Sequence, residues 1–326
     1  MNFQLRYILL LTTFIIVVIA TMWLLMKGLS YSFDQLTAPD SSDSSDSIEL
    51  RSEAITQSVL SQKSGYIEKI ENFALQEFGI NRVLSHFVEA DVYLNFKDEP
   101  ALLVNPRVTI YDKNGETDYI LKSKRANYLT TGEVSFKGEV DISSNSGTSH
   151  KMNTEELLVD TNTDDLLSNE KVTYLGEGSK IISQGMSMQT KVDKMKLTGD
   201  VVINQDSGQK MLTKDLYVDQ SNDQKHYYSD DKITYLSSEN KVYAQGMDMK
   251  DKAIQLLGQV NILQNSGSTI DTEDLIVDQS NNAEVYITDN GIHYQSSLAE
   301  IRALGMRYDA DKQKIQFVGD VVGRYD

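Results

Sequence analysis

Four stretches of the chain alternate apolar and polar residues around a central glycine. They span Val134–Ile142, Met195–Ile203, Ile254–Ile262 and Ile315–Gly323. Alternation with a period of two predicts a β-strand that has one apolar and one polar face. The central glycines, Gly138, Gly199, Gly258 and Gly319, are 61, 59 and 61 residues apart. A period near sixty residues indicates one unit stacked on itself, because a single unit cannot bury its own apolar face.

The rest of the unit repeats as well. Turn sequences follow the first three of these strands, at 145–147, 206–208 and 265–267. An apolar strand that ends in aspartate comes next, then a short strand that ends in tyrosine, and then an element with a Gly-Met pair that begins at Gly185, Gly246 and Gly305. Periodicity leaves open which side chains of this last element face inward. Four strands per period predict two facing antiparallel sheets, to which each repeat adds two strands, or roughly 10 Å at about 4.8 Å per strand.

The apolar faces of the glycine-centred strands are expected to line the space between the two sheets. The candidate lining residues are Val134, Phe136, Val140, Ile142, Leu197, Val201, Ile203, Leu256, Val260, Ile262, Phe317 and Val321. Each central glycine has two compatible interpretations: a bend or bulge in the strand, or a place where a guest chain lies against bare backbone. Such a stack is either a trough for hydrocarbon or a rod with a dry core.

The N-terminus differs from this β pattern. Residues Tyr7–Met26 contain no charge and would form a helix about 30 Å long, which matches the apolar thickness of a bilayer. A cleavable signal peptide is the alternative, but its apolar region is shorter and ends at a small-residue cleavage site. We therefore expect an uncleaved membrane anchor, with the N-terminus in the cytoplasm and the bulk of the chain exported.

These patterns divide the chain into four parts. Residues 1–27 form the cytoplasmic tip and membrane helix, and residues 28–64 form a polar tether that includes the low-complexity stretch Pro39–Ser47. Residues 65–203 and 204–326 form successive parts of one β stack. Between Ile70 and Phe96, periodicity alone does not separate helix from strand.

Composition argues against several classes of function. The net charge of −17 argues against a nucleic-acid partner, which requires a basic surface. The chain has no cysteine, and its four histidines, His86, His150, His226 and His293, lack the spacing of a metal site. The loops Asp160–Asp165 and Asp219–Asp223 resemble calcium loops but lack the required glycine, so Asx turns explain them better. We expect no catalytic residue, metal or cofactor.

Particular segments resemble a known family. They are Val108–Leu121 with Asp112 and Gly115 in its turn, Lys124–Tyr128, Val134–Val140, Val172–Tyr174, Gly185–Met188 and Lys196–Val201. Together with the N-terminal apolar segment, they are similar to the LptC family of lipopolysaccharide export proteins over roughly residues 66–203. Residues after 204 look like further copies of the unit, similar to LptA, the soluble bridge protein of the same OstA-like fold.

The resemblance implies an all-β, two-sheet β-jellyroll in which 70–96 is a strand pair. It also implies a single-pass inner-membrane protein that takes lipopolysaccharide from an ABC transporter of the LptB/F/G type. Lipid A acyl chains would occupy the apolar groove, and an LptA-like bridge protein would receive them through pairing of sheet edges. Residues Lys314–Val322 would leave such an edge open.

Two other classes remain in consideration. One is a membrane-anchored structural β-solenoid, an adhesive spacer with a dry core. The other is a β-helical polysaccharide lyase, which needs a cluster of Asp, Arg and Lys that the repeats do not contain.

Overall fold

The computed structural model describes residues 65–79, 82–112, 114–129, 131–144, 151–176, 178–221, 225–250, 252–280 and 283–325. The predicted membrane anchor and polar tether lie outside these residues, as does His150. Within the described ranges, no helix is long and apolar enough to cross a membrane.

The described residues form 26 antiparallel strands, and residues 70–96 form a strand pair, as the family resemblance implied. The first twelve strands are β1 (Tyr66–Phe78), β2 (Leu84–Phe96), β3 (Ala101–Val104), β4 (Arg107–Tyr111), β5 (Thr117–Lys122), β6 (Arg125–Tyr128), β7 (Glu133–Ser144), β8 (Lys151–Asp160), β9 (Leu166–Ser168), β10 (Val172–Gly176), β11 (Ser179–Ser183) and β12 (Gly185–Gln189). A short 3-10 turn, η1 (Thr190–Val192), precedes β13.

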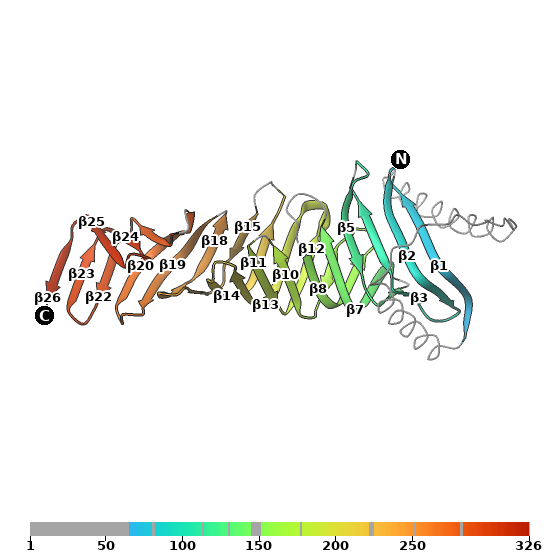
Figure 1. Cartoon of the computed structure of the whole chain (residues 1–326), viewed down its shortest axis with the longest axis horizontal. Coiled ribbons are helices and arrows are strands. Elements are labelled where there is room, and N and C mark those ends of the chain that lie inside the picture. The colour runs from blue at the N-terminus through green and yellow to red at the C-terminus, as the bar shows by residue number, and fades with distance from the viewer. Residues whose placement is uncertain are drawn as a thin grey trace, which may run out of the picture. The chain divides into compact units, whose positions relative to one another are not determined.

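The later strands repeat the same order (Figure 1). They are β13 (Lys194–Gln205), β14 (Lys210–Asp219), β15 (His226–Ser229), β16 (Ile233–Leu236), β17 (Asn240–Ala244), β18 (Gly246–Lys250), β19 (Ala253–Gln264), β20 (Thr269–Asp278), β21 (Val285–Thr288), β22 (Ile292–Gln295), β23 (Ala299–Ala303), β24 (Gly305–Asp309), β25 (Lys314–Val318) and β26 (Val322–Tyr325).

Each long strand belongs to two layers. The first half of β13 pairs with β12, and its second half pairs with β11. The partner strand β14 is divided in the same way, because its first half pairs with β16 and its second half with β15. We call the layer that contains β11 and β16 the first layer, and the layer that contains β12 and β15 the second. The strands cross between the layers along one edge, here called the spine. Hairpin turns form the opposite edge of each layer, here called its rim.

The central glycines lie at the spine. The register of β13 against β14 shifts between Leu197 and Asp200, and Gly199 has a φ of 79°. The same shift occurs in β7 and β19, where Gly138 and Gly258 also have positive φ. The bend interpretation of these glycines is therefore confirmed.

The number of strands per repeat differs from the prediction. Because every strand or strand pair crosses the spine, one repeat adds four segments to each layer rather than two. At about 4.8 Å per strand, that is roughly 19 Å per repeat. The sequence pattern missed the second crossing because the short strands on either side of it look like separate elements.

One apolar core fills the space between the layers. It extends without a break from Tyr119 to Ala310 and contains inner-face residues of both layers. The pairing of β13 with β14 carries it across the predicted boundary between residues 203 and 204.

A second, smaller apolar cluster lies on the other face of the second layer. It consists of Val92, Leu94, Phe96, Leu102 and Val104. In the register of β3 with β6, Leu103 lies opposite Ala126, which belongs to the main core. Leu102 and Val104 alternate with Leu103 and therefore point to the outer face. The sequence did not indicate this cluster.

Candidate functional site: the interior between the two layers

The structure places almost all the predicted lining residues in the interior. Phe136, Val140, Ile142, Leu197, Val201, Ile203, Leu256, Val260 and Ile262 belong to the main core, and Val134 and Phe317 pack against it. Val321 is the exception: it lies in the bend between β25 and β26 and is 52% exposed. No described strand pairs with the far side of β25 or β26, so Val321 is not covered within the described structure.

The Gly-Met elements contribute inward-facing methionines. In β12, Met186 and Met188 are buried and Ser187 between them is exposed. Met186 lies opposite Leu197 and Met188 lies opposite Met195, so all four share the inner face. This settles the orientation that periodicity left open. The flexible methionine side chains fill the interior between the branched residues of the neighbouring strands.

Tyrosines form a second inward-facing set. The repeated strands that end in tyrosine were predicted, but their tyrosines were not predicted to line the interior. Tyr174 and Tyr235 come from equivalent strands of the first layer, and Tyr286 comes from the second layer; all three are fully buried. Burial raises the pKa of each phenol, so the hydroxyls stay protonated at neutral pH. The tyrosines recur at equivalent positions in successive repeats, and this recurrence could have predicted that they face the interior.

The central glycines do not line the interior. A Cβ added at Gly199 would meet the side chain of Gln184, which is exposed at the spine. The corresponding neighbour is Gln245 at Gly258, and it is Lys124 at Gly138 and Leu304 at Gly319. The space beside each glycine is therefore taken by a side chain of the neighbouring crossing.

The glycines of the Gly-Met elements serve close packing of the backbone. A Cβ at Gly185 would lie 2.8 Å from the carbonyl oxygen of Ser168, and one at Gly305 would lie 2.7 Å from that of Thr288. At Gly246 the distance to the Ser229 oxygen is 3.0 Å. The three positions predicted as motif glycines are therefore structural.

Buried hydroxyls stabilise the same crossings. Ser229 is fully buried; its hydroxyl donates to the carbonyl oxygen of Asp215 at 2.8 Å and accepts from the backbone N–H of Asp231 at 3.2 Å. Thr288 makes the equivalent bonds to Asp274 and Asn290 one repeat later. These residues satisfy backbone groups where the strands leave one layer for the other.

The interior is partly accessible at its N-terminal end. In β1, Leu75 lies opposite Val88, which lies opposite Val108 of the core-facing side of β4, so all three share the inner face. Leu75 is 52% exposed and Ile70 is 38% exposed, while Tyr93 and Val88 are half-buried. Phe73 stacks on Tyr93 with ring centroids 5.0 Å apart. We call Ile70, Phe73, Leu75, Val88 and Tyr93 the N-terminal mouth.

The C-terminal end presents open strand edges. Among the described strands, β25 pairs with β24 alone and β26 pairs with β23 alone. Val318 and Val322 on these edge strands are 51% and 69% exposed. Within the described strands, the edge predicted at Lys314–Val322 is therefore open, and β26 leaves a second open edge in the other layer.

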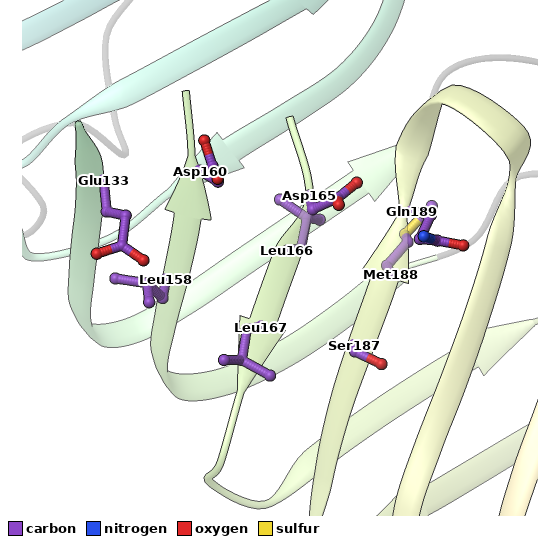
Figure 2. Close-up of a pocket in the computed structure, with 9 residues that line it drawn as sticks. All are labelled: Glu133, Leu158, Asp160, Asp165, Leu166, Leu167, Ser187, Met188 and Gln189. Carbon is purple, nitrogen blue, oxygen red and sulfur yellow. The ribbon is translucent and has the colours of Figure 1, made fainter. Parts of the chain in front are cut away.

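Two hollows of the described surface lie outside the interior. The first has a volume of 330 Å³ and is formed by the outer face of the second layer, where Leu158, Leu167 and Ser187 come from neighbouring strands (Figure 2). The second, of 1100 Å³, lies over the first layer near the spine. A row of paired residues crosses it: Tyr243, Asn261, Asp271, His293 and Arg302. Both hollows also touch buried core residues, such as Met188 in the first and Val260 in the second.

The polar loops are Asx turns, as predicted. Oδ1 of Asp160 accepts from the backbone N–H of Asn162 at 2.8 Å, and Oδ1 of Asp219 accepts from Ser221 at 3.0 Å. The bond from Asn162 lowers the pKa of Asp160. The hydroxyl of Ser221, which donates to Oδ1 of Asp219 at 2.5 Å, and then the Ser221 backbone N–H lower the pKa of Asp219. Within the ranges described, no three His, Cys, Asp or Glu side chains are arranged to hold a metal ion.

Two layers of bent antiparallel strands around a continuous apolar interior define a repeat protein of the β-jellyroll class. The sequence model of one protein family, described as lipopolysaccharide-assembly, LptC-related, matches residues 14–197, 187–262 and 248–326. The chain therefore belongs to the LptC-related family, and this places it in lipopolysaccharide transport. The three successive matches agree with the internal repeats. No curated protein matches the chain.

Proposed function

We propose that this protein is a membrane-anchored carrier that holds the acyl chains of lipopolysaccharide between its two layers and passes them along the repeats. The observation that carries the proposal is the apolar interior, which is continuous over the repeats and half-exposed at the N-terminal mouth. Acyl chains crossing water expose apolar area at about 25 cal/mol per Å², and an apolar lining offsets much of this cost.

The proposed path has a direction. The N-terminal mouth lies next to the segment that leads to the predicted inner-membrane anchor, so lipid would enter there from an ABC transporter of the LptB/F/G type. It would leave at the opposite end, where β25 and β26 would extend the sheets of an LptA-like bridge protein by edge pairing. Transport energy would come from the transporter, and this chain would supply the surface.

Site-specific photo-crosslinking tests the proposal. A photoreactive residue replaces Leu75 on the inner face of β1, and the matched control replaces its neighbour Gln76, which points to the other face and is also exposed. A second pair is Met186 and Ser187 in β12. Adducts with lipopolysaccharide are expected at Leu75 and Met186. Equal yields on the two faces of each strand would contradict the proposal.

A second candidate function is a structural spacer with a dry core. The observation that favours it is the close filling of the middle repeats, where Leu197, Ile203 and Leu216 are completely buried. A spacer would give no lipid adduct at Met186 during export, and the same experiment therefore separates the two functions.

A further inference from the structure

Polar side chains join the two rims on the side opposite the spine. The side-chain amides of Gln205, on the first rim, and Gln279, on the second, exchange hydrogen bonds of 3.2 and 3.1 Å. The amide of Gln279 also donates to the hydroxyl of Tyr235 at 3.1 Å. Gln279 thus binds the first layer in two places.

The same contact continues along the rims. Gln209 of the first rim donates to Glu284 of the second at 3.4 Å, and Gln313 donates to Glu239 at 3.2 Å. In the interior beside them, Asn240 donates to the hydroxyl of Tyr286 at 3.4 Å. One repeat earlier, Gln220 donates to Tyr174 at 3.5 Å, a longer form of the pair between Gln279 and Tyr235. Closure of the rims therefore recurs with the repeat.

The two layers are joined more weakly at the rims than at the spine. At the spine, the polypeptide itself connects the two layers at each crossing, and backbone and hydroxyl hydrogen bonds stabilise the crossings. At the rims, the layers are joined by side-chain hydrogen bonds alone among the bonds described here. Rotation about the glycine bulges would open the rims first, in the manner of a hinge.

The hydrogen bonds at the rims offer little resistance to opening. Each neutral hydrogen bond contributes about 0.5–1.5 kcal/mol, because water replaces the lost partner. Glu284 is a buried carboxyl group that is 7% exposed, and the side-chain oxygen of Gln209 is buried without a hydrogen-bond partner in the described structure. Both groups regain water when the rims part, which offsets part of the loss.

We infer that Gln205, Gln279 and Tyr235 form a latch that must open to admit acyl chains into the middle repeats. The inference rests on the proposed lipid-carrying function. It adds that opening of the rims controls when acyl chains enter the middle repeats. The closed latch explains how one interior is sealed from water when empty and yet accepts hydrocarbon when loaded.

A reversible crosslink tests the latch in the full-length protein. The chain has no cysteine, so Gln205→Cys with Gln279→Cys introduces a unique pair. A short bifunctional thiosulfonate reagent then joins the rims, and a reductant releases them. The probe is fluorescently labelled lipopolysaccharide, and its uptake is followed in detergent-solubilised protein. Uptake is expected to fall about tenfold or more in the crosslinked protein, equivalent to at least ~1.4 kcal/mol, and to recover after reduction.

A matched crosslink controls for the reagent. Lys180 and Asn204 lie opposite each other in β11 and β13 within the first layer. Crosslinking Lys180→Cys with Asn204→Cys should leave uptake unchanged. As a converse test, Gln279→Ala removes the latch hydrogen bonds and should speed uptake roughly twofold to tenfold.

The outcomes distinguish failure of the latch from failure of the carrier function. Equal uptake by the crosslinked and reduced Gln205–Gln279 pair overturns the latch and leaves the carrier function standing. Absence of uptake in the unmodified protein overturns the carrier function, and the latch with it. Loss of uptake in the Lys180–Asn204 control as well would also overturn the latch, because stiffening one layer would then be sufficient.

Discussion

The backbone N–H of Gly199 donates to Oδ1 of Asp215 at 2.9 Å, and the same bond joins Gly258 to Asp274 at 2.8 Å one repeat later. At this bulge the N–H has lost its partner in the β-ladder, so a carboxylate of the adjacent strand accepts it instead. The ammonium of Lys196 lies 2.7 Å from Oδ2 of Asp215, and these two donors hold the pKa of Asp215 below its usual value. The bend therefore depends on an acidic residue as well as on the glycine.

The first prediction concerns Asp215 and separates its hydrogen bond with Gly199 from its ion pair with Lys196. Asp215→Asn keeps an oxygen that can accept from Gly199 and loses only the half-buried surface ion pair with Lys196, so the free energy of unfolding in urea should change by less than about 1 kcal/mol. Asp215→Ala leaves the Gly199 N–H without its acceptor and should cost about 1–3 kcal/mol. Equal losses for the two variants would show that the hydrogen bond to the bulge does not stabilise it.

The second prediction concerns Gly305 at a spine crossing. Gly305→Ala would bring a Cβ to 2.7 Å from the backbone oxygen of Thr288, and backbone cannot yield as a flexible side chain does. We expect a loss of about 1–3 kcal/mol in the free energy of unfolding, typical of overpacked sites. In the same repeat, Gly291→Ala places its Cβ 4.0 Å from the nearest atom and should be nearly neutral. Thermal unfolding of both variants measures the difference; equal melting temperatures would contradict it.

The sequence predicted the parts of this fold that depend on period. Alternation around Gly138, Gly199 and Gly258 located the long strands, their inward faces and the repeat length. It did not predict that each strand changes layer. A glycine at a positive-φ bulge and a glycine inside a regular strand give the same sequence pattern. Residues such as Gln205 and Gln279 are 74 positions apart and polar, so only the folded rims bring them together. The outer cluster around Leu94 could not be predicted for a similar reason. Alternation shows that a strand has an apolar face, but it does not show whether that face points to the interior or to the outside.

The third prediction concerns pH and His86 beside the N-terminal mouth. Nδ1 of His86 lies 3.5 Å from Glu77 and Nε2 lies 3.6 Å from Asp164 on the second rim. The hydrogen bond with Glu77, and then the charges of both carboxylates, raise the pKa of His86 above its ordinary 6.5, although burial opposes this. A raised pKa means that the stabilisation is fully present below pH 6.5 and is lost as the pH rises through the higher, folded-state value.

Hydrogen exchange of the β1 and β2 backbone amides measures this effect. Exchange corrected for its intrinsic pH dependence should accelerate as the pH rises above about 6.5 in the natural protein. His86→Gln retains hydrogen-bonding capacity without the titrating charge, so its corrected exchange should stay flat over that range. The same acceleration in His86→Gln would exclude this histidine as the source. Glu77, whose pKa is lowered by His86, weakens the pair only at a pH below its ordinary 4.5.

The fourth prediction concerns the open edges at the end of the chain. Deletion of β25 and β26 would expose β23 and β24 as new edges, so substitutions that keep these strands give a sharper test. Val318→Lys with Val322→Lys places two charges on the exposed edge strands, and lysine on an edge strand discourages pairing with another sheet. Binding to a purified LptA-like bridge protein should weaken roughly tenfold or more, which corresponds to about 1.4 kcal/mol.

Leu298→Lys provides the matched control for this edge. Leu298 is 70% exposed, but it lies in the turn between β22 and β23 rather than on an edge strand. Its substitution adds a charge and removes an exposed apolar side chain, as the edge variants do, and should leave the affinity unchanged. Thermal unfolding should be the same in all these variants, since none of the three side chains is buried. Weaker binding in Leu298→Lys to the same degree would indicate that general charge, rather than edge pairing, determines the association.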